Sequence, residues 1–194
     1  MPVKFLWLLL FLFGTSCAVD VREAPSADIS NLVAVDSNVN THQSVLAAPE
    51  LQVRHFRLKF YGYDTVYYSL RAKKSFQNLA ETAYYLVIDA NYGGLPRHYD
   101  TVQFADSSSY PTQHLHHQII RCQIFGNMTD SCLYRDRAEL QLNPRTVEQA
   151  GKAGLSLSFT LASADTRYET LDIPANYING LLLAVQNLNS PTQP

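Results

Sequence analysis

The stretch Leu155-Ser156-Leu157-Ser158-Phe159-Thr160-Leu161 carries the clearest pattern in this chain. Apolar and small polar side chains alternate without interruption, which is typical of a strand with one buried and one exposed face, here over 155–162. Seven other segments show the same alternation or an apolar run of strand length: 52–60, 64–71, 83–90, 98–105, 115–125, 132–142 and 167–173. We therefore predict about eight short strands, paired mostly antiparallel in one sheet or a two-sheet sandwich.

Two helices interrupt the predicted strands. Asn143 offers a side-chain N-cap and Pro144 suits the first helical position, so a short helix is expected over about 144–151. After Pro174, apolar residues recur at helical spacing, which predicts a C-terminal helix packed on the sheet. These residues are Tyr177, Ile178, Leu181, Leu182, Val185 and Leu188. Gly180 is expected where this helix approaches the sheet closely. The predicted fold is a β-rich α+β domain.

Composition excludes several classes of protein. The chain has 194 residues and a formal net charge of −2, with 16% charged and 46% hydrophobic residues. This balance does not fit a disordered charged chain or a strongly basic nucleic-acid-binding domain. Gly and Pro are too few for a collagen-like or low-complexity protein. The length predicts a single domain.

The N-terminus carries an export signal. Lys4 precedes nine consecutive apolar residues, Phe5–Phe13, and the small-residue stretch Gly14-Thr15-Ser16-Cys17-Ala18 follows. At about 1.5 Å per residue the apolar run reaches only ~14 Å, which is too short for a bilayer-spanning helix. These residues resemble the precursor of a bacterial lipoprotein, in which small residues precede a cysteine at the cleavage site. Thr15 and Ser16 fit that pattern, whereas Gly14 stands where the class usually has Leu.

The resemblance implies that the signal peptide 1–16 is removed and that Cys17 becomes the lipid-bearing first residue. Because Ala18 rather than Asp follows the cysteine, it also implies an outer-membrane lipoprotein facing the periplasm. Ordinary cleavage after Ala18 is the alternative and gives a soluble secreted or periplasmic protein. Either outcome leaves Cys122 and Cys132 as an even pair.

The exported chain divides into three parts. Residues 17–50 lack sustained periodicity and contain the breakers Pro25 and Pro49, so we expect a flexible tether of roughly 30 residues with a coil dimension of ~30 Å. Residues 51–188 are expected to form the single β-rich domain. The polar, proline-containing tail 189–194 is expected to be disordered.

Cys122 and Cys132 flank an interval that reads as a hairpin loop. Pairing the two cysteines places Ile120 opposite Tyr134 and gives both cysteines an inward orientation. In an exported protein this arrangement predicts a cross-strand disulfide. The spacing differs from the Cys-x-x-Cys of redox sites, so the expected role is structural.

The histidine cluster near residue 114 is a candidate metal site. On a strand, His114 and His116 lie on the same side and His117 on the other. Two ligands do not hold zinc, and a third could come only through the fold, from residues His98, Asp100 or Asp106. An exposed polar strand is the interpretation that we prefer, so no metal or other cofactor is predicted.

Basic residues outnumber acidic ones between residues 51 and 74. If segments 52–60 and 64–71 pair, Arg57, Lys59 and Arg71 share an outward face with Tyr67. Such a face suits an anionic partner, such as a lipid headgroup or a polysaccharide. A solvated sheet face is the alternative.

Motifs for common catalytic sites are missing from the sequence. It contains no Gly-x-Ser-x-Gly elbow, no dinucleotide-binding glycine motif and no phosphate-binding loop.

We expect a noncatalytic envelope lipoprotein that serves as a scaffold, an assembly factor or a ligand-binding module. Its expected partners are the membrane, through the lipid, and an anionic envelope component or a protein, but not nucleic acid. One alternative is a small secreted hydrolase or metal-dependent enzyme using segment 98–117. Another is a eukaryotic secreted glycoprotein modified at the Asn127 sequon.

Overall fold

Antiparallel strand pairing organises the chain. The computed structural model describes residues 20–38, 42–57, 62–75, 82–94, 96–97, 99, 101–104, 108–122, 132–160 and 168–189. The strands are β1 (Ala34–Asn38), β2 (Gln43–Ala47), β3 (Leu51–Arg57), β4 (Gly62–Ser75), β5 (Thr82–Gly94), β6 (Thr101–Phe104), β7 (Ser109–Pro111), β8 (Gln113–Cys122), β9 (Cys132–Leu142), β10 (Leu155–Thr160) and β11 (Tyr168–Ile173). The helices are α1 (Ser26–Leu32), α2 (Pro144–Ala153) and α3 (Ala175–Asn189).

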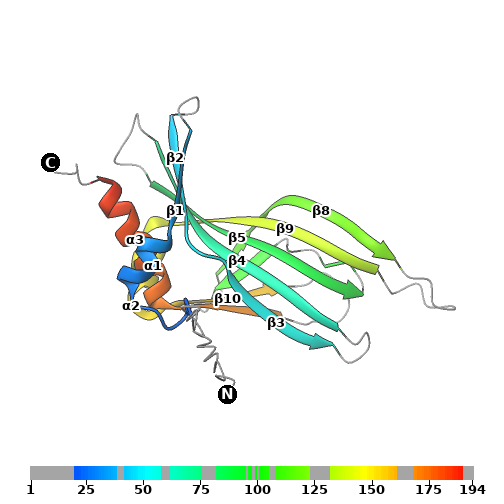
Figure 1. Ribbon diagram of the computed structural model, residues 1–194. Helices are drawn as coiled ribbons and strands as arrows, with labels where there is room; N and C mark the ends of the chain where they lie inside the picture. Colours follow the sequence, from blue (N-terminus) through cyan, green and yellow to red (C-terminus); the bar gives the residue numbers. More distant parts are fainter. Residues whose placement is uncertain are drawn as a thin grey trace, which may run out of the picture.

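The strands form two sheets. The larger has seven strands in the order β1-β2-β4-β5-β9-β8, with β3 also paired to β4, and the smaller has the order β11-β10-β6-β7. All of these pairs are antiparallel. The helices gather at one end, and the long strands run away from them (Figure 1). The predicted β-rich α+β fold is therefore confirmed.

The core lies between the two sheets and extends under α3. Alternate side chains of β4 are buried, among them Tyr68 and Leu70, and β10 contributes Leu157 and Phe159. The Tyr68 hydroxyl donates to the carbonyl of Asp172 in the facing sheet (2.9 Å). The predicted apolar stripe of α3 is buried at Tyr177, Ile178, Leu181 and Val185.

Both predicted helices form. The Asn143 side chain accepts a hydrogen bond from the Arg145 backbone N–H (2.9 Å), and Pro144 begins α2. Gly154 ends it with a φ of +83°, a backbone conformation that favours glycine. Within the described residues, no helix combines the length and apolarity needed to cross a bilayer.

The prediction of a flexible tether up to residue 50 is wrong for the part that the structure describes. This part contains α1, β1 and β2, and β2 pairs with β4 in the large sheet. Ile29 and Leu46 are completely buried, and Ala24 is nearly so. Each of these elements has only five to seven residues. Their periodicity is therefore too brief to stand out in the sequence.

Gly180 marks a close approach between helices rather than the predicted approach to the sheet. A Cβ atom added at this position would lie 2.5 Å from Cγ2 of Ile29 in α1 and 3.2 Å from the carbonyl oxygen of Ser26. The absence of a side chain at residue 180 thus lets α1 lie directly on α3. The N-terminal helix, which the sequence did not reveal, is the reason for this glycine.

The disulfide between Cys122 and Cys132 is present and joins β8 to β9. The predicted register beyond the cysteines is wrong, because β8 has irregularities between His114 and His116 and between Ile119 and Arg121. Ile119, not Ile120, consequently pairs with Tyr134. Cys122 is exposed, as is every residue of β8, although its pairing puts it on the same face of the sheet as Cys132, which packs against the core.

Candidate functional site

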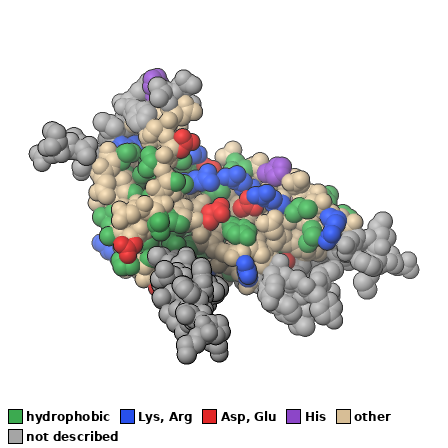
Figure 2. Space-filling model, in the orientation of Figure 1, with side chains coloured by type: hydrophobic (Ala, Val, Ile, Leu, Met, Phe, Trp, Pro, Cys, Tyr) green, Lys and Arg blue, Asp and Glu red, His purple; other side chains and the backbone are tan. Residues whose placement is uncertain are grey.

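The outer face of the large sheet, which points away from the core, carries a shallow polar hollow over β4, β5 and β9. Its volume is about 170 Å³, and its lining residues are Glu50, Tyr67, Tyr68, Ser69, Arg71, Val87, Asp89, Arg135 and Arg137. Basic and acidic side chains gather across the middle of the visible face (Figure 2). With three arginines and two carboxylates, the lining has a formal charge of +1.

One arginine of the hollow is neutralised by a carboxylate. Asp89 lies opposite Arg137 in the strand register, but its carboxylate accepts two hydrogen bonds from Arg135, from Nε (2.9 Å) and Nη2 (2.6 Å). These bonds and the charge of Asp89 raise the pKa of Arg135, and the charge of Glu50 adds a smaller effect. This bidentate pair leaves Arg137 without its nearest cross-strand carboxylate.

Arg71 and Arg137 differ from Arg135 because neither has an acidic partner within the described residues. The Nε atoms of both side chains are buried and make no hydrogen bond there. A guanidinium N–H that has lost water without gaining an acceptor is costly, so these side chains gain more than a solvated arginine when they turn toward an incoming oxyanion. The two side chains are therefore the open cationic groups of the hollow.

Lys73 does not add to this open charge. Its Nζ, on β4, lies 2.9 Å from the Glu139 carboxylate on β9. The ammonium group also lies 3.9 Å from the centre of the Tyr85 ring. Since Lys73 is engaged in this way, it does not add an unpaired charge next to the hollow.

The predicted anion-contact residues do not form one cluster. Arg71 lines the hollow together with Tyr67, in agreement with the prediction that the two residues share an outward face. Arg57 pairs with Gly62 at the opposite end of β4, nine positions or ~30 Å from Arg71. Lys59 lies outside the described residues. The grouping of Arg57 with Arg71 is therefore wrong, because the β3–β4 register separates them.

Arg135 and Arg137 were missed in the sequence, although a signal was present. Residues 133–142 alternate between polar and buried positions, which puts these two arginines on the outer face. The pattern was used only to predict a strand. That β9 lies beside β5, and so puts Arg137 in the same hollow as Arg71, depends on a sheet order that alternation does not reveal.

The histidines of β8 do not assemble a metal site within the described residues. His114 and His116 are exposed, and the irregularity between them breaks the simple two-residue repeat. His116 Nε2 lies 3.4 Å from the Gln118 side-chain oxygen. The proposed third ligands at positions 98, 100 and 106 lie outside the described residues.

His117, which the sequence did not single out as a ligand, contacts a buried carboxylate. Its Nδ1 is hydrogen-bonded to the buried carboxylate of Asp136, and its ring stacks on Tyr134 at 5.7 Å. The Tyr92 hydroxyl donates to the same carboxylate and accepts from the Arg97 backbone N–H (2.8 Å). Burial first, and then the Asp136 carboxylate, raise the pKa of Tyr92. This network links β5, β8 and β9, so its evident role is structural.

Cys17 and Asn127 lie outside the described residues, as do positions 98, 100 and 105–107 of the segment considered for an enzyme. Comparison of the chain with protein-family models, curated proteins and solved structures gives no match. The hollow and the N-terminal sequence are therefore the features of the chain that bear on its function.

Proposed function

We propose that this protein is a noncatalytic cell-envelope lipoprotein that binds an anionic partner on the outer face of its large sheet. The observation that carries the proposal is the pair Arg71 and Arg137. Both line one hollow, and both have buried Nε atoms without a hydrogen-bond partner in the described residues. Each guanidinium group is suited to the planar, bidentate recognition of carboxylate and phosphate oxygens.

The shape of the hollow favours one charged group of a larger partner over an enclosed small molecule. Its volume of about 170 Å³ is below the ~300–1,000 Å³ of ordinary small-molecule pockets. Tyr67 lies at its lining and its hydroxyl oxygen accepts a hydrogen bond from Gln52 Nε2 (3.1 Å), so the hydroxyl hydrogen can be donated to a ligand. A phosphate or carboxylate on an envelope polymer, lipid or protein fits these features.

The N-terminal sequence supports an envelope location. Lys4, the apolar run Phe5–Phe13 and the small residues before Cys17 support export followed by lipid attachment. An acylated cysteine anchors a protein stably when more than one chain is attached. A scaffold or assembly role is consistent with an open binding surface on a membrane-anchored domain.

Binding of inorganic phosphate and of a sulfated dextran tests the proposal by calorimetry at low salt. The double variant Arg71→Gln/Arg137→Gln should weaken binding of the polymer by about tenfold or more, because each charge-assisted hydrogen bond contributes about 1.5–3 kcal/mol. The double variant Arg145→Gln/Lys152→Gln is a matched control, since it removes the same charge from exposed positions of α2. Equal weakening in both double variants would show that net charge, not the hollow, determines binding.

A further inference from the structure

We propose that the lipid-anchored protein lies with its N-terminal turn directly on the membrane surface and is not held away from it by a tether. This inference rests on the lipid anchor of the proposed function. It follows from the finding that the fold already includes the chain from Asp20 onward.

The N-terminal turn is fastened to two distant parts of the fold. The backbone N–H groups of Glu23 and Ala24 both donate to the carbonyl of Asp20 (3.0 Å each). Arg22 Nη2 donates to the carbonyl of Gln52 in β3 (2.7 Å). These contacts fix the turn against the large sheet.

Helix α3 holds the same turn from the other side. Asn176 Nδ2 donates to the carbonyls of Arg22 (3.0 Å) and Ala24 (2.7 Å). Ala24 is 5% exposed and belongs to the hydrophobic core. Because several hydrogen bonds and a buried side chain act within five residues, the turn moves with the domain as a unit.

Chain length then fixes how far the domain can be from its anchor. Cys17 precedes Asp20 by three residues. At most about 3.3–3.6 Å per residue, this connection spans no more than ~11 Å. A tether of roughly 30 residues would have allowed ~30 Å. A lipid on Cys17 therefore brings the domain into contact with the headgroup region.

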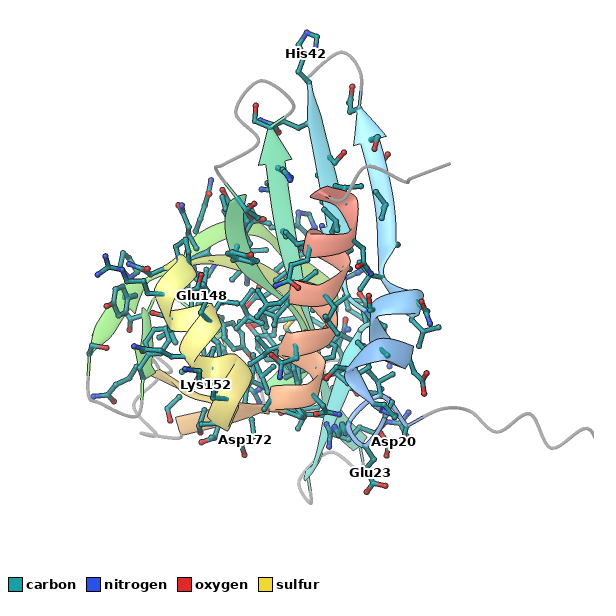
Figure 3. The ribbon with its side chains drawn as sticks, turned by 90° about the vertical axis from the view of Figure 1, so that its left-hand side faces the viewer. Asp20, Glu23, His42, Glu148, Lys152 and Asp172 are labelled. Atoms are coloured by element: carbon teal, nitrogen blue, oxygen red, sulfur yellow. A yellow bond between two sulfur atoms is a disulfide. The ribbon has the colours of Figure 1, made fainter. Side chains whose placement is uncertain are left out.

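The structure also specifies which end makes the contact. Asp20, Glu23 and Asp172 lie at one end of the molecule, and His42 lies at the opposite end (Figure 3). The near end thus carries three carboxylates, and Arg22 beside them is exposed. Acidic residues do not attract the domain to an anionic leaflet. The covalent anchor, and not the charge of this end, therefore holds it against the headgroups.

Fluorescence quenching in vesicles tests this arrangement with the full lipidated protein. A fluorophore is placed on Glu23→Cys or, as the control, on Gln43→Cys; both positions are exposed, and residue 43 adjoins His42. The native cysteines at 122 and 132 are joined in a disulfide and do not react. In phosphatidylethanolamine–phosphatidylglycerol vesicles with a nitroxide on the headgroup, the label at 23 should be quenched several-fold more strongly than the label at 43.

A second variant separates contact from attachment. A flexible Gly/Ser insertion of about ten residues between Val19 and Asp20 adds a coil of ~17 Å and should reduce quenching at 23 while the protein stays with the vesicles. Protein that sediments with the vesicles but shows equal quenching at 23 and 43 would overturn the inference and leave the anchor intact. Protein that does not sediment would overturn the lipid anchor itself, and this inference with it.

Discussion

At the scale of single residues, the buried tyrosines make stability depend on alkaline pH. Burial is the main cause that raises the pKa of Tyr68, Tyr84, Tyr92 and Tyr177 above the ordinary 10.0. The fold therefore favours the neutral phenol. Below pH 10 the folded and unfolded chains hold these protons equally, and above it the unfolded chain loses them first. The free energy of unfolding should fall as the pH rises above about 10.

Urea unfolding of the wild type and of Tyr177→Phe at pH 8 and at about pH 10.5 tests this dependence. The Tyr177 hydroxyl accepts from the Leu70 N–H (3.3 Å) and donates to the Pro49 carbonyl (2.7 Å). Its loss should cost about 1–3 kcal/mol at pH 8 and make the alkaline decline shallower. Tyr110→Phe, at an exposed position, is the control and should change neither value. An unchanged alkaline decline in Tyr177→Phe would show that this phenol is not a source of the pH dependence.

The site residues show what a sequence pattern can and cannot predict. Alternation in 64–71 was enough to put Arg71 on an outward face with Tyr67, and both line the hollow. Its partner Arg137 lies two strands away in the sheet and 66 positions later in the chain. No local pattern specifies that neighbourhood, because it depends on which strands pair. Asp89 forms its ion pair with Arg135 and not with Arg137. This pairing depends on side-chain geometry, which a sequence pattern does not predict.

At the scale of secondary-structure elements, prediction was correct where a pattern was long or where specific residues marked the start of an element. The regular alternation of 155–160 and the Asn143-Pro144 start of α2 both correspond to observed elements. The apolar run 83–90 became the central part of β5, which pairs on both edges. Short elements such as β1, β2 and β7 were missed, since three to five residues do not establish a period.

Strand β8 is the element that depends most on cross-links. It lies at the end of the large sheet, all its residues are exposed, and two irregularities interrupt its ladder with β9. The contact between His117 and Asp136 and the disulfide between Cys122 and Cys132 join it to β9. Exposed edge strands with few buried contacts open more readily than central strands.

Replacing both cysteines, as Cys122→Ser/Cys132→Ser, should therefore loosen β8 selectively. Opening this loop should lower the free energy of unfolding by ~3 kcal/mol on the chain-entropy account. Hydrogen exchange should accelerate in β8 more than in β4 or β5, and phosphate or polymer binding at Arg71 and Arg137 should persist. Equal acceleration in β8, β4 and β5 would contradict a local role for the disulfide.

At the scale of the whole molecule, the N-terminal segment completes the domain and does not merely precede it. Helix α1 packs on α3, and β2 extends the large sheet through β4. The segment also joins the proposed membrane anchor to the domain through the turn at Asp20. The tether prediction failed because burial of Ile29 depends on a surface of α3 located about 150 residues later in the chain.

Gly180→Ala tests how tightly that segment is joined to the rest. Alanine is favoured over glycine in a helix interior by ~1 kcal/mol, so propensity alone predicts stabilisation. The new methyl group would meet Ile29 at 2.5 Å and should separate α1 from α3, at an overpacking cost of about 1–3 kcal/mol. We expect lower stability in urea unfolding and faster hydrogen exchange in α1.

Asn187→Ala, at an exposed position of the same helix, is the control and should stabilise slightly. Ile29→Gly removes both opposing atoms, Cγ2 (2.5 Å) and Cβ (2.6 Å), so the double variant Ile29→Gly/Gly180→Ala should be more stable than the sum of the two single changes predicts. Strict additivity would show that this close approach does not hold α1 in place, because two groups that compete for one space cannot act independently.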